Sequence, residues 1–185
     1  MSGDNAKRRV RVLAEDRRSE RLIRKLLDGW GYDRRRVEYI TAPAGSGAAE
    51  AWVRVRYVEE VRRLRARSNQ TGLCLIAMRD GDAAGLDDRK RDLDEALRDA
   101  GLAVRGQDPI ATPVPTWSVE TWLLHLLGTA VNEVESKKAA FEQAYRTSDK
   151  EEQALRGAAQ AWPGAEPRPG SLDDGRAEFQ RIGGS

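Results

Sequence analysis

Short apolar segments alternate with longer segments of helical periodicity over the first two thirds of the chain. Each apolar segment has the length of a buried strand. Strands are expected at 10–14, 37–41, 73–78 and 110–114. Helices, in which apolar residues recur on one face, are expected at 19–28, 48–67, 87–100 and 118–127. This order predicts an α/β fold with a mostly parallel central sheet of about four strands, flanked by helices.

Short polar side chains mark where these helices begin. Ser19 and Ser118 precede apolar helical stretches and are expected to be N-caps. Either Asp87 or Asp88 is expected to cap the third helix in the same way.

Composition divides the chain into three parts. Residues 1–9 are polar and basic and are expected to be a disordered lead-in. Residues 10–127 hold the alternating elements and form the predicted α/β domain. Residues 128–185 are expected to form a helical and loop C-terminal extension. Within it we expect one or two helices at 132–156, a loop at 162–170 and a last helical turn at 177–182.

The overall charge balance says little about partners. The chain has 185 residues, with 32 Lys and Arg against 30 Asp and Glu, and a net charge of +2. The basic residues nevertheless gather locally, at 7–9, 17–18, 34–36 and 62–67. Each cluster is either a solvated face or a set of phosphate contacts, and the sequence leaves both readings open.

The single cysteine, Cys74, lies inside an apolar segment. A lone cysteine forms no internal disulfide and suits a reducing compartment, and this one is expected to be buried rather than nucleophilic. No apolar stretch reaches the ~20 residues of a membrane span, and no apolar segment follows the basic N-terminus as in a secretory signal. We therefore expect a cytoplasmic protein with no membrane partner.

Three carboxylates follow predicted strands. Glu15 ends the first apolar segment, and Asp80 and Asp82 come directly after the third. Parallel α/β sheets form their sites in the crevice beyond the carboxyl ends of the strands, so these side chains are expected to converge. Hard carboxylate oxygens suit Mg²⁺ or Mn²⁺, which indicates metal-dependent chemistry on phosphate. The competing reading is that the Asp-Gly-Asp segment is only a turn.

Two further acids belong to the candidate site. Asp16 adjoins Glu15 and is a possible additional metal ligand. Glu120 stands in the first turn of the fourth predicted helix, where it either extends the site or simply complements the helix dipole.

Three basic residues near the acids are possible phosphate-binding groups. Arg79 either screens the repulsion between the neighbouring carboxylates or binds phosphate. Arg89 and Lys90 lie early in the third predicted helix, from which they either reach a bound phosphate or remain solvated surface residues.

The segment 12–23, VLAEDRRSERLI, together with Asp80-Gly81-Asp82, resembles the TOPRIM domain shared by topoisomerases, primases and overcoming-lysogenization-defect-type nucleases. A second segment, TPVPTWSVETWLL at 112–124, is similar to small stand-alone prokaryotic TOPRIM-like proteins. The resemblance covers 10–127. One position departs from the pattern, because Asp16 stands where family members usually have glycine.

The resemblance implies a Rossmann-like TOPRIM fold in which Glu15, Asp80 and Asp82 hold Mg²⁺ or Mn²⁺ and carry the catalysis. It implies a nuclease or phosphotransfer enzyme acting on nucleic acid, with a place in bacterial genome defence, and leaves DNA or RNA open. The alternative is a non-catalytic binding or regulatory module that works with a partner such as an ATPase. A homo-oligomer is possible in either case. A receiver-like phosphoacceptor fits less well, because no lysine follows the strand at 110–114.

Overall fold

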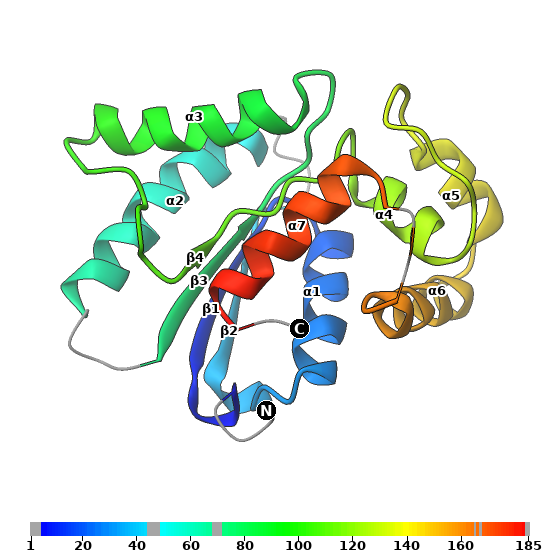
Figure 1. Cartoon of the computed structure of the whole chain (residues 1–185), viewed down its shortest axis with the longest axis horizontal. Coiled ribbons are helices and arrows are strands. Elements are labelled where there is room, and N and C mark those ends of the chain that lie inside the picture. The colour runs from blue at the N-terminus through cyan, green and yellow to red at the C-terminus, as the bar shows by residue number, and fades with distance from the viewer. Residues whose placement is uncertain (1–4, 44–48, 68–71, 165, 167, 184–185) are drawn as a thin grey trace.

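A four-stranded parallel sheet forms the centre of the computed structural model, which describes residues 5–43, 49–67, 72–164, 166 and 168–183 (Figure 1). Its strands are β1 (Arg9–Ala14), β2 (Val37–Thr41), β3 (Leu73–Met78) and β4 (Ile110–Ala111). They lie in the order β2-β1-β3-β4, and every pair is parallel. The predicted α/β architecture with a mostly parallel sheet is therefore confirmed.

Helices cover both faces of the sheet. The α-helices are α1 (Arg17–Gly29), α2 (Ala49–Ala66), α3 (Gly85–Asp99), α4 (Val119–Leu126), α5 (Lys138–Ala144), α6 (Ser148–Ala161) and α7 (Gly170–Arg181). Two 3₁₀ turns, η1 (Asn5–Lys7) and η2 (Arg34–Arg36), precede β1 and β2. Within the described residues, no helix is both long and apolar enough to cross a membrane.

Strand alternation divides the core into two layers. Val12 and Ile76 face a layer formed with α1, α4, α6 and α7, whereas Leu13 and Leu75 face α2 and α3. Successive strand side chains point to opposite faces, so two helical layers bury both sides of one sheet. Cys74 is buried in the first layer, as expected.

The C-terminal extension shares this core. Trp162, after α6, and Phe179, on α7, pack edge-to-face at 5.6 Å between ring centroids. Both rings also contact Trp30, which follows α1, and Trp162 contacts Trp122 of α4. Helices α5, α6 and α7, together with Trp162, therefore complete the hydrophobic layer on one face of the sheet.

Two predicted N-caps are wrong. The helix after β1 is capped by Asp16, whose Oδ1 accepts the N–H groups of Arg18 (2.6 Å) and Ser19 (3.0 Å). The third helix begins at Gly85, so Asp87 and Asp88 lie inside its first turn, where their charge complements the helix dipole. The fourth helix does begin after Ser118, as predicted.

Other boundaries also differ from the sequence-based expectation. Strand β4 stops at Ala111, because Pro113 and Pro115 offer no N–H to extend the ladder. The last helix is much longer than the predicted turn at 177–182 and spans Gly170–Arg181. Part of the expected lead-in at 1–9 is ordered as η1 and the start of β1, with the Asn5 amide donating to the carbonyls of Trp30 and Gly183. Residues 1–4 of that lead-in lie outside the described residues.

Candidate functional site: an acidic cleft at the carboxyl edge of the sheet

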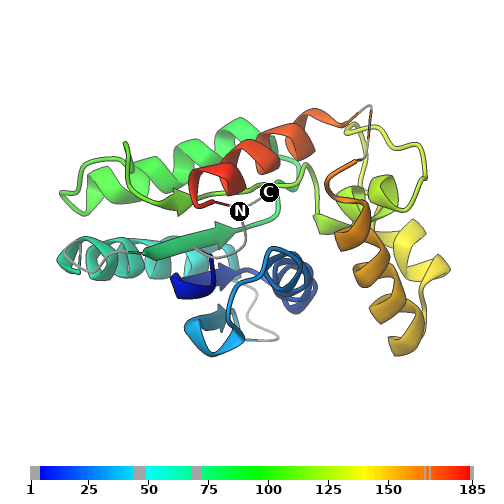
Figure 2. The same ribbon diagram turned by 60° about the horizontal axis from the view of Figure 1, so that its bottom comes forward.

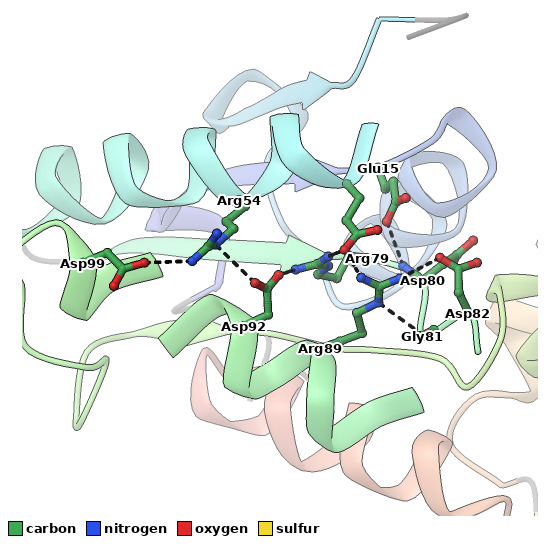
Figure 3. A network of polar contacts seen from close by, with 10 residues as sticks. Glu15, Arg54, Arg79, Asp80, Gly81, Asp82, Arg89, Asp92 and Asp99 are labelled. Carbon is green, nitrogen blue, oxygen red and sulfur yellow. Dashed lines mark hydrogen bonds and ion pairs between the residues drawn. The ribbon is translucent and has the colours of Figure 1, made fainter. Parts of the chain in front are cut away.

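Glu15 and Asp80 meet where two neighbouring strands end. Strands β1 and β3 pair in parallel with Ala14 opposite Met78, so the residues that follow them emerge side by side. The Asp80 N–H donates to Glu15 Oε2 at 3.1 Å, as Figure 3 shows. The predicted convergence of these acids is therefore present in the structure.

Gly81 is required by the loop between the two aspartates. Its N–H donates to the Pro115 carbonyl at 2.9 Å, and a Cβ at this position would lie only 2.8 Å from that same oxygen. The close approach between the loop and the 115–117 segment thus excludes a side chain at Gly81.

Asp82 and Trp117 form an antiparallel bridge in which both residues have positive φ, 45° and 64°. The Asp82 N–H donates to the Trp117 carbonyl at 2.8 Å. Non-glycine residues in this left-handed region are uncommon, and aspartate is among those that tolerate it best. The Asp82 carboxylate is 56% exposed and pairs with Arg89.

Asp80 is the electrostatic centre of the site. Its pKa lies well above 3.8, first because the carboxylate is buried and then because the carboxylates of Asp16, Glu120, Glu15 and Asp82 repel its charge. The Val119 N–H, at the start of α4, donates to Asp80 Oδ1 at 3.2 Å and opposes this effect only in part.

Burial also raises the pKa of Glu15, against the hydrogen bond from the Asp80 N–H and the charge of Arg79. Both of these neighbouring carboxylates are therefore easier to protonate than free acids. Such like-charged acids at one position are typical of sites that act on protons or metals.

A cleft of about 590 Å³ opens over these acids. Its walls come from the ends of β1 and β3, the starts of α1, α2 and α4, and helices α5 and α6. Figure 2 shows α4, α5 and α6 together at one end of the molecule. The charged residues lining it are Glu15, Asp16, Arg17, Arg18, Arg21, Asp80, Asp82, Glu120, Lys138, Glu142 and Glu151. The cleft is thus highly charged, and acids outnumber bases among these residues.

Glu120 lies in the cleft wall but is already neutralised. It is 3% exposed and pairs with Arg18 Nη1, while Arg18 Nε donates to Glu151 at 2.9 Å. This arginine links α1 to α4 and α6, so its pairing of Glu120 is a structural tie as well as a charge balance.

Asp16, which the sequence leaves as a possible metal ligand, has both oxygens engaged within its own turn. Oδ1 accepts the two N–H groups of the cap, and Oδ2 accepts the Ser19 hydroxyl at 2.7 Å. Asp16 therefore acts as a helix cap whose charge is felt by Asp80, rather than as a free ligand.

The three candidate phosphate-binding residues lie in different places. Arg89 is at the rim of the site, where Nη2 contacts Asp82 Oδ2 at 3.0 Å and Nη1 pairs with Glu50 of α2 (Figure 3). Arg79 is fully buried behind the acids and holds Asp92 at 2.5 Å.

Lys90 points away from the cleft. Its ammonium contacts Asp174 (2.5 Å) and Glu178 (3.0 Å) on α7. Of the two readings that the sequence leaves open for Lys90, these contacts oppose phosphate binding beside the acids, because the next helical position projects about 100° around the helix axis from Arg89.

Sequence reasoning missed the cleft residues contributed by the C-terminal extension. Lys138 and Glu142 of α5 and Glu151 of α6 form one wall. No local pattern marks them, since only the packing of α5 against α4, and of α6 against α1 and α4, brings them to the site. Arg18 and Glu120 were each visible in the sequence, but their ion pair and the contact of Arg18 with Glu151 were not.

The donor set fits a hard divalent cation. Glu15, Asp80 and Asp82 supply carboxylate oxygens. Burial is the first cause of the raised pKa of both Glu15 and Asp80, and only for Asp80 do several neighbouring carboxylates add to it. Within the described part of the chain, however, no group of three or more His, Cys, Asp or Glu side chains already stands in an arrangement that could hold a metal ion. Metal binding would therefore need side-chain adjustment, beginning with Asp82 and its partner Arg89.

No protein-family model matches the chain, and the comparisons with curated proteins and with solved structures give no significant match. The TOPRIM resemblance thus rests on the sequence motifs alone and stays a prediction.

Proposed function

We propose that this protein is a divalent-metal-dependent, TOPRIM-like nuclease or phosphotransfer enzyme that acts on nucleic acid phosphodiesters. The observation that carries the proposal is the concentration of mutually repelling carboxylates around the partly buried Asp80, at the carboxyl edge of a parallel sheet. Carboxylates held together at such an edge are stabilised by a bound cation, and open α/β sheets form their ligand sites there.

Glu15, Asp80 and Asp82 would hold Mg²⁺ or Mn²⁺. The ion would supply charge neutralisation at a phosphate and an acidified water. The pKa of Glu15 is raised towards neutral pH, which suits this carboxyl group to proton transfer beside the ion. Arg89, which contacts Asp82 at the rim, would turn to the substrate phosphate when the cation replaces it beside that carboxylate.

A specific observation favours a second function, a non-catalytic binding or regulatory module. Arg18 and Arg89 already neutralise Glu120 and Asp82. A site whose acids are balanced by the protein's own arginines has less need of a metal, and its charged surface then suits a protein partner such as an ATPase.

Calorimetric titration with Mg²⁺ and Mn²⁺ tests the proposal. Wild type is expected to bind, and the variant Asp80→Asn/Asp82→Asn to lose binding. The matched control is Asp87→Asn/Asp88→Asn, which removes the same charge from exposed acids on α3 and should bind like wild type. Wild type that fails to bind either ion overturns the enzyme and favours the module.

Cleavage assays on single- and double-stranded DNA and RNA then separate the two functions. The enzyme predicts cleavage that requires the metal and is lost in Glu15→Gln and Asp80→Asn. Metal binding without cleavage of any of the four substrates supports the module. We place either activity in the cytoplasm, where a reducing environment suits the single buried Cys74.

A further inference from the structure

A second charged cleft lies at the opposite edge of the sheet. It is about 460 Å³ in volume and is formed where β1, β2 and β3 begin, together with η2 and the residue after α2. The strands run upward in Figure 1, so this edge is the lower one. A six-residue strand separates it from the acids by roughly 20 Å, and the two clefts share no lining residue.

Arginine dominates this cleft, which we call the amino-edge cleft. Its charged lining residues are Arg9, Arg11, Arg35, Arg36, Arg67, Asp33 and Glu38. Arginines therefore outnumber acids along this lining, although the net charge of the chain is only +2. The basic clusters of the sequence at 7–9, 34–36 and 62–67 each contribute to it.

Acidic residues of the protein neutralise part of this positive charge. Arg11 is buried and donates to Glu60 through Nε and Nη2, the latter at 3.1 Å, and pairs with Glu38 through Nη1. Arg36 Nε lies 3.8 Å from Asp33. Through Arg11 these contacts join β1 to α2 and β2.

Three other guanidinium groups of the lining have no acidic partner among the described residues. Arg9, Arg35 and Arg67 are exposed, and their side chains form no hydrogen bond or ion pair with any residue that the structure describes. They come from three separate elements, β1, η2 and the end of α2. Unpaired cations of like sign around a concavity repel one another and focus a positive potential into it, which attracts a multiply charged anion.

The residue types of the lining indicate which kind of anion the cleft binds. None of the described residues around the amino-edge cleft is aromatic, so it offers no platform for stacking a base. Guanidinium forks match phosphate oxygens in pairs. We infer that the amino-edge cleft binds the phosphates of a multiply charged ligand, an oligophosphate or the backbone of a nucleic acid strand, through Arg9, Arg35 and Arg67 and without reading bases.

Binding of two probes in metal-free buffer with chelator tests this inference. The probes are tripolyphosphate and a labelled oligothymidylate, each titrated at low ionic strength. The variant Arg35→Ala/Arg67→Ala is expected to bind about tenfold or more weakly, a loss of about 1.4 kcal/mol or more. The salt dependence of oligonucleotide binding should also fall by about 1.4 in slope, ~0.7 for each lost phosphate contact.

The control is Arg34→Ala/Arg91→Ala. It removes the same charge from arginines outside the cleft that already pair with Asp28 and Asp88, and it should change affinity less than twofold. Equal weakening by both variants would show that only net charge matters and would overturn the site. Failure of wild type to bind either probe overturns it as well.

Comparison of the probes identifies the source of the phosphate. Binding of tripolyphosphate alone supports a small oligophosphate ligand, and binding of the oligonucleotide supports a strand backbone. Because chelator removes the metal, the variant Asp80→Asn/Asp82→Asn should bind both probes like wild type. The outcome therefore stands apart from that of the proposed metal site.

Discussion

We predict that the negative charge of Glu178 stabilises the packing of α7 against the sheet. Substitution of Glu178 by glutamine tests this prediction. The carboxylate accepts hydrogen bonds from Arg105 Nη2 (2.6 Å), the Thr112 N–H (2.8 Å) and Lys90 (3.0 Å). Burial alone would raise the pKa of Glu178, but these donors outweigh it and lower the pKa from 4.5 to about 2. The variant Glu178→Gln keeps the shape of the side chain and removes the charge.

The expected magnitude follows from that pKa difference. At ~1.4 kcal/mol for each pKa unit, the ionised carboxylate contributes about 3 kcal/mol to the free energy of unfolding at neutral pH. Between pH 4.5 and about 2 the unfolded chain binds the proton and the folded protein does not. The contribution is therefore fully present above pH 4.5 and is lost as the pH falls through this window.

Urea unfolding of wild type and Glu178→Gln between pH 3 and 7 measures the effect. The variant should be about 3 kcal/mol less stable at pH 7, and the gap should narrow to about 1 kcal/mol at pH 3. The control Glu95→Gln, at an exposed position on α3, should show a small gap at every pH. A gap for Glu178→Gln that stays constant over this range would refute the reasoning, because it would not depend on the charge.

Two further substitutions give clear expectations. Gly175→Ala should destabilise the protein by about 1–3 kcal/mol despite the better helix propensity of alanine, because its Cβ would lie 2.4 Å from Cη2 of the buried Trp122. The control Gly157→Ala should be neutral or stabilising, because its Cβ would meet only the flexible end of Leu127 at 3.1 Å. Equal losses of stability for the two variants in thermal unfolding would contradict this. Asp80→Asn should make the metal-free protein more stable than wild type at neutral pH, because burial and the surrounding carboxylates oppose the charge of Asp80. Urea unfolding in the presence of chelator measures this difference. A variant less stable than wild type would argue against that repulsion.

Prediction from the sequence succeeded where local pattern and sheet geometry suffice. The apolar segments predicted the four strands, and parallel order then required Glu15 and Asp80 to emerge at one edge. Sequence-based prediction failed where the local helix signal is weak and tertiary packing stabilises the helix instead. Helix α7 contains Gly175, a poor helix former, yet Phe179 and the contacts of Glu178 hold the helix against the rest of the core.

Assignment of roles within the site depended on partners far away in the chain. Asp16 and Glu120 are both acids near the cleft, but one caps a helix and the other pairs with Arg18, 102 positions earlier. Lys90 and Arg89 are neighbours, but one contacts α7 and the other contacts Asp82.

The sequence by itself determined the α/β architecture and the convergence of Glu15 with Asp80, because periodicity and parallel pairing depend on the order of residue types along the chain. Tertiary structure alone decided which charges stay free. Arg9, Arg35 and Arg67 look like the other arginines in the sequence, and only the packing of three elements leaves them around one concavity. The physical reason is that a charge is neutralised by whatever lies within a few ångströms of it in space, and that distance is unrelated to separation along the chain.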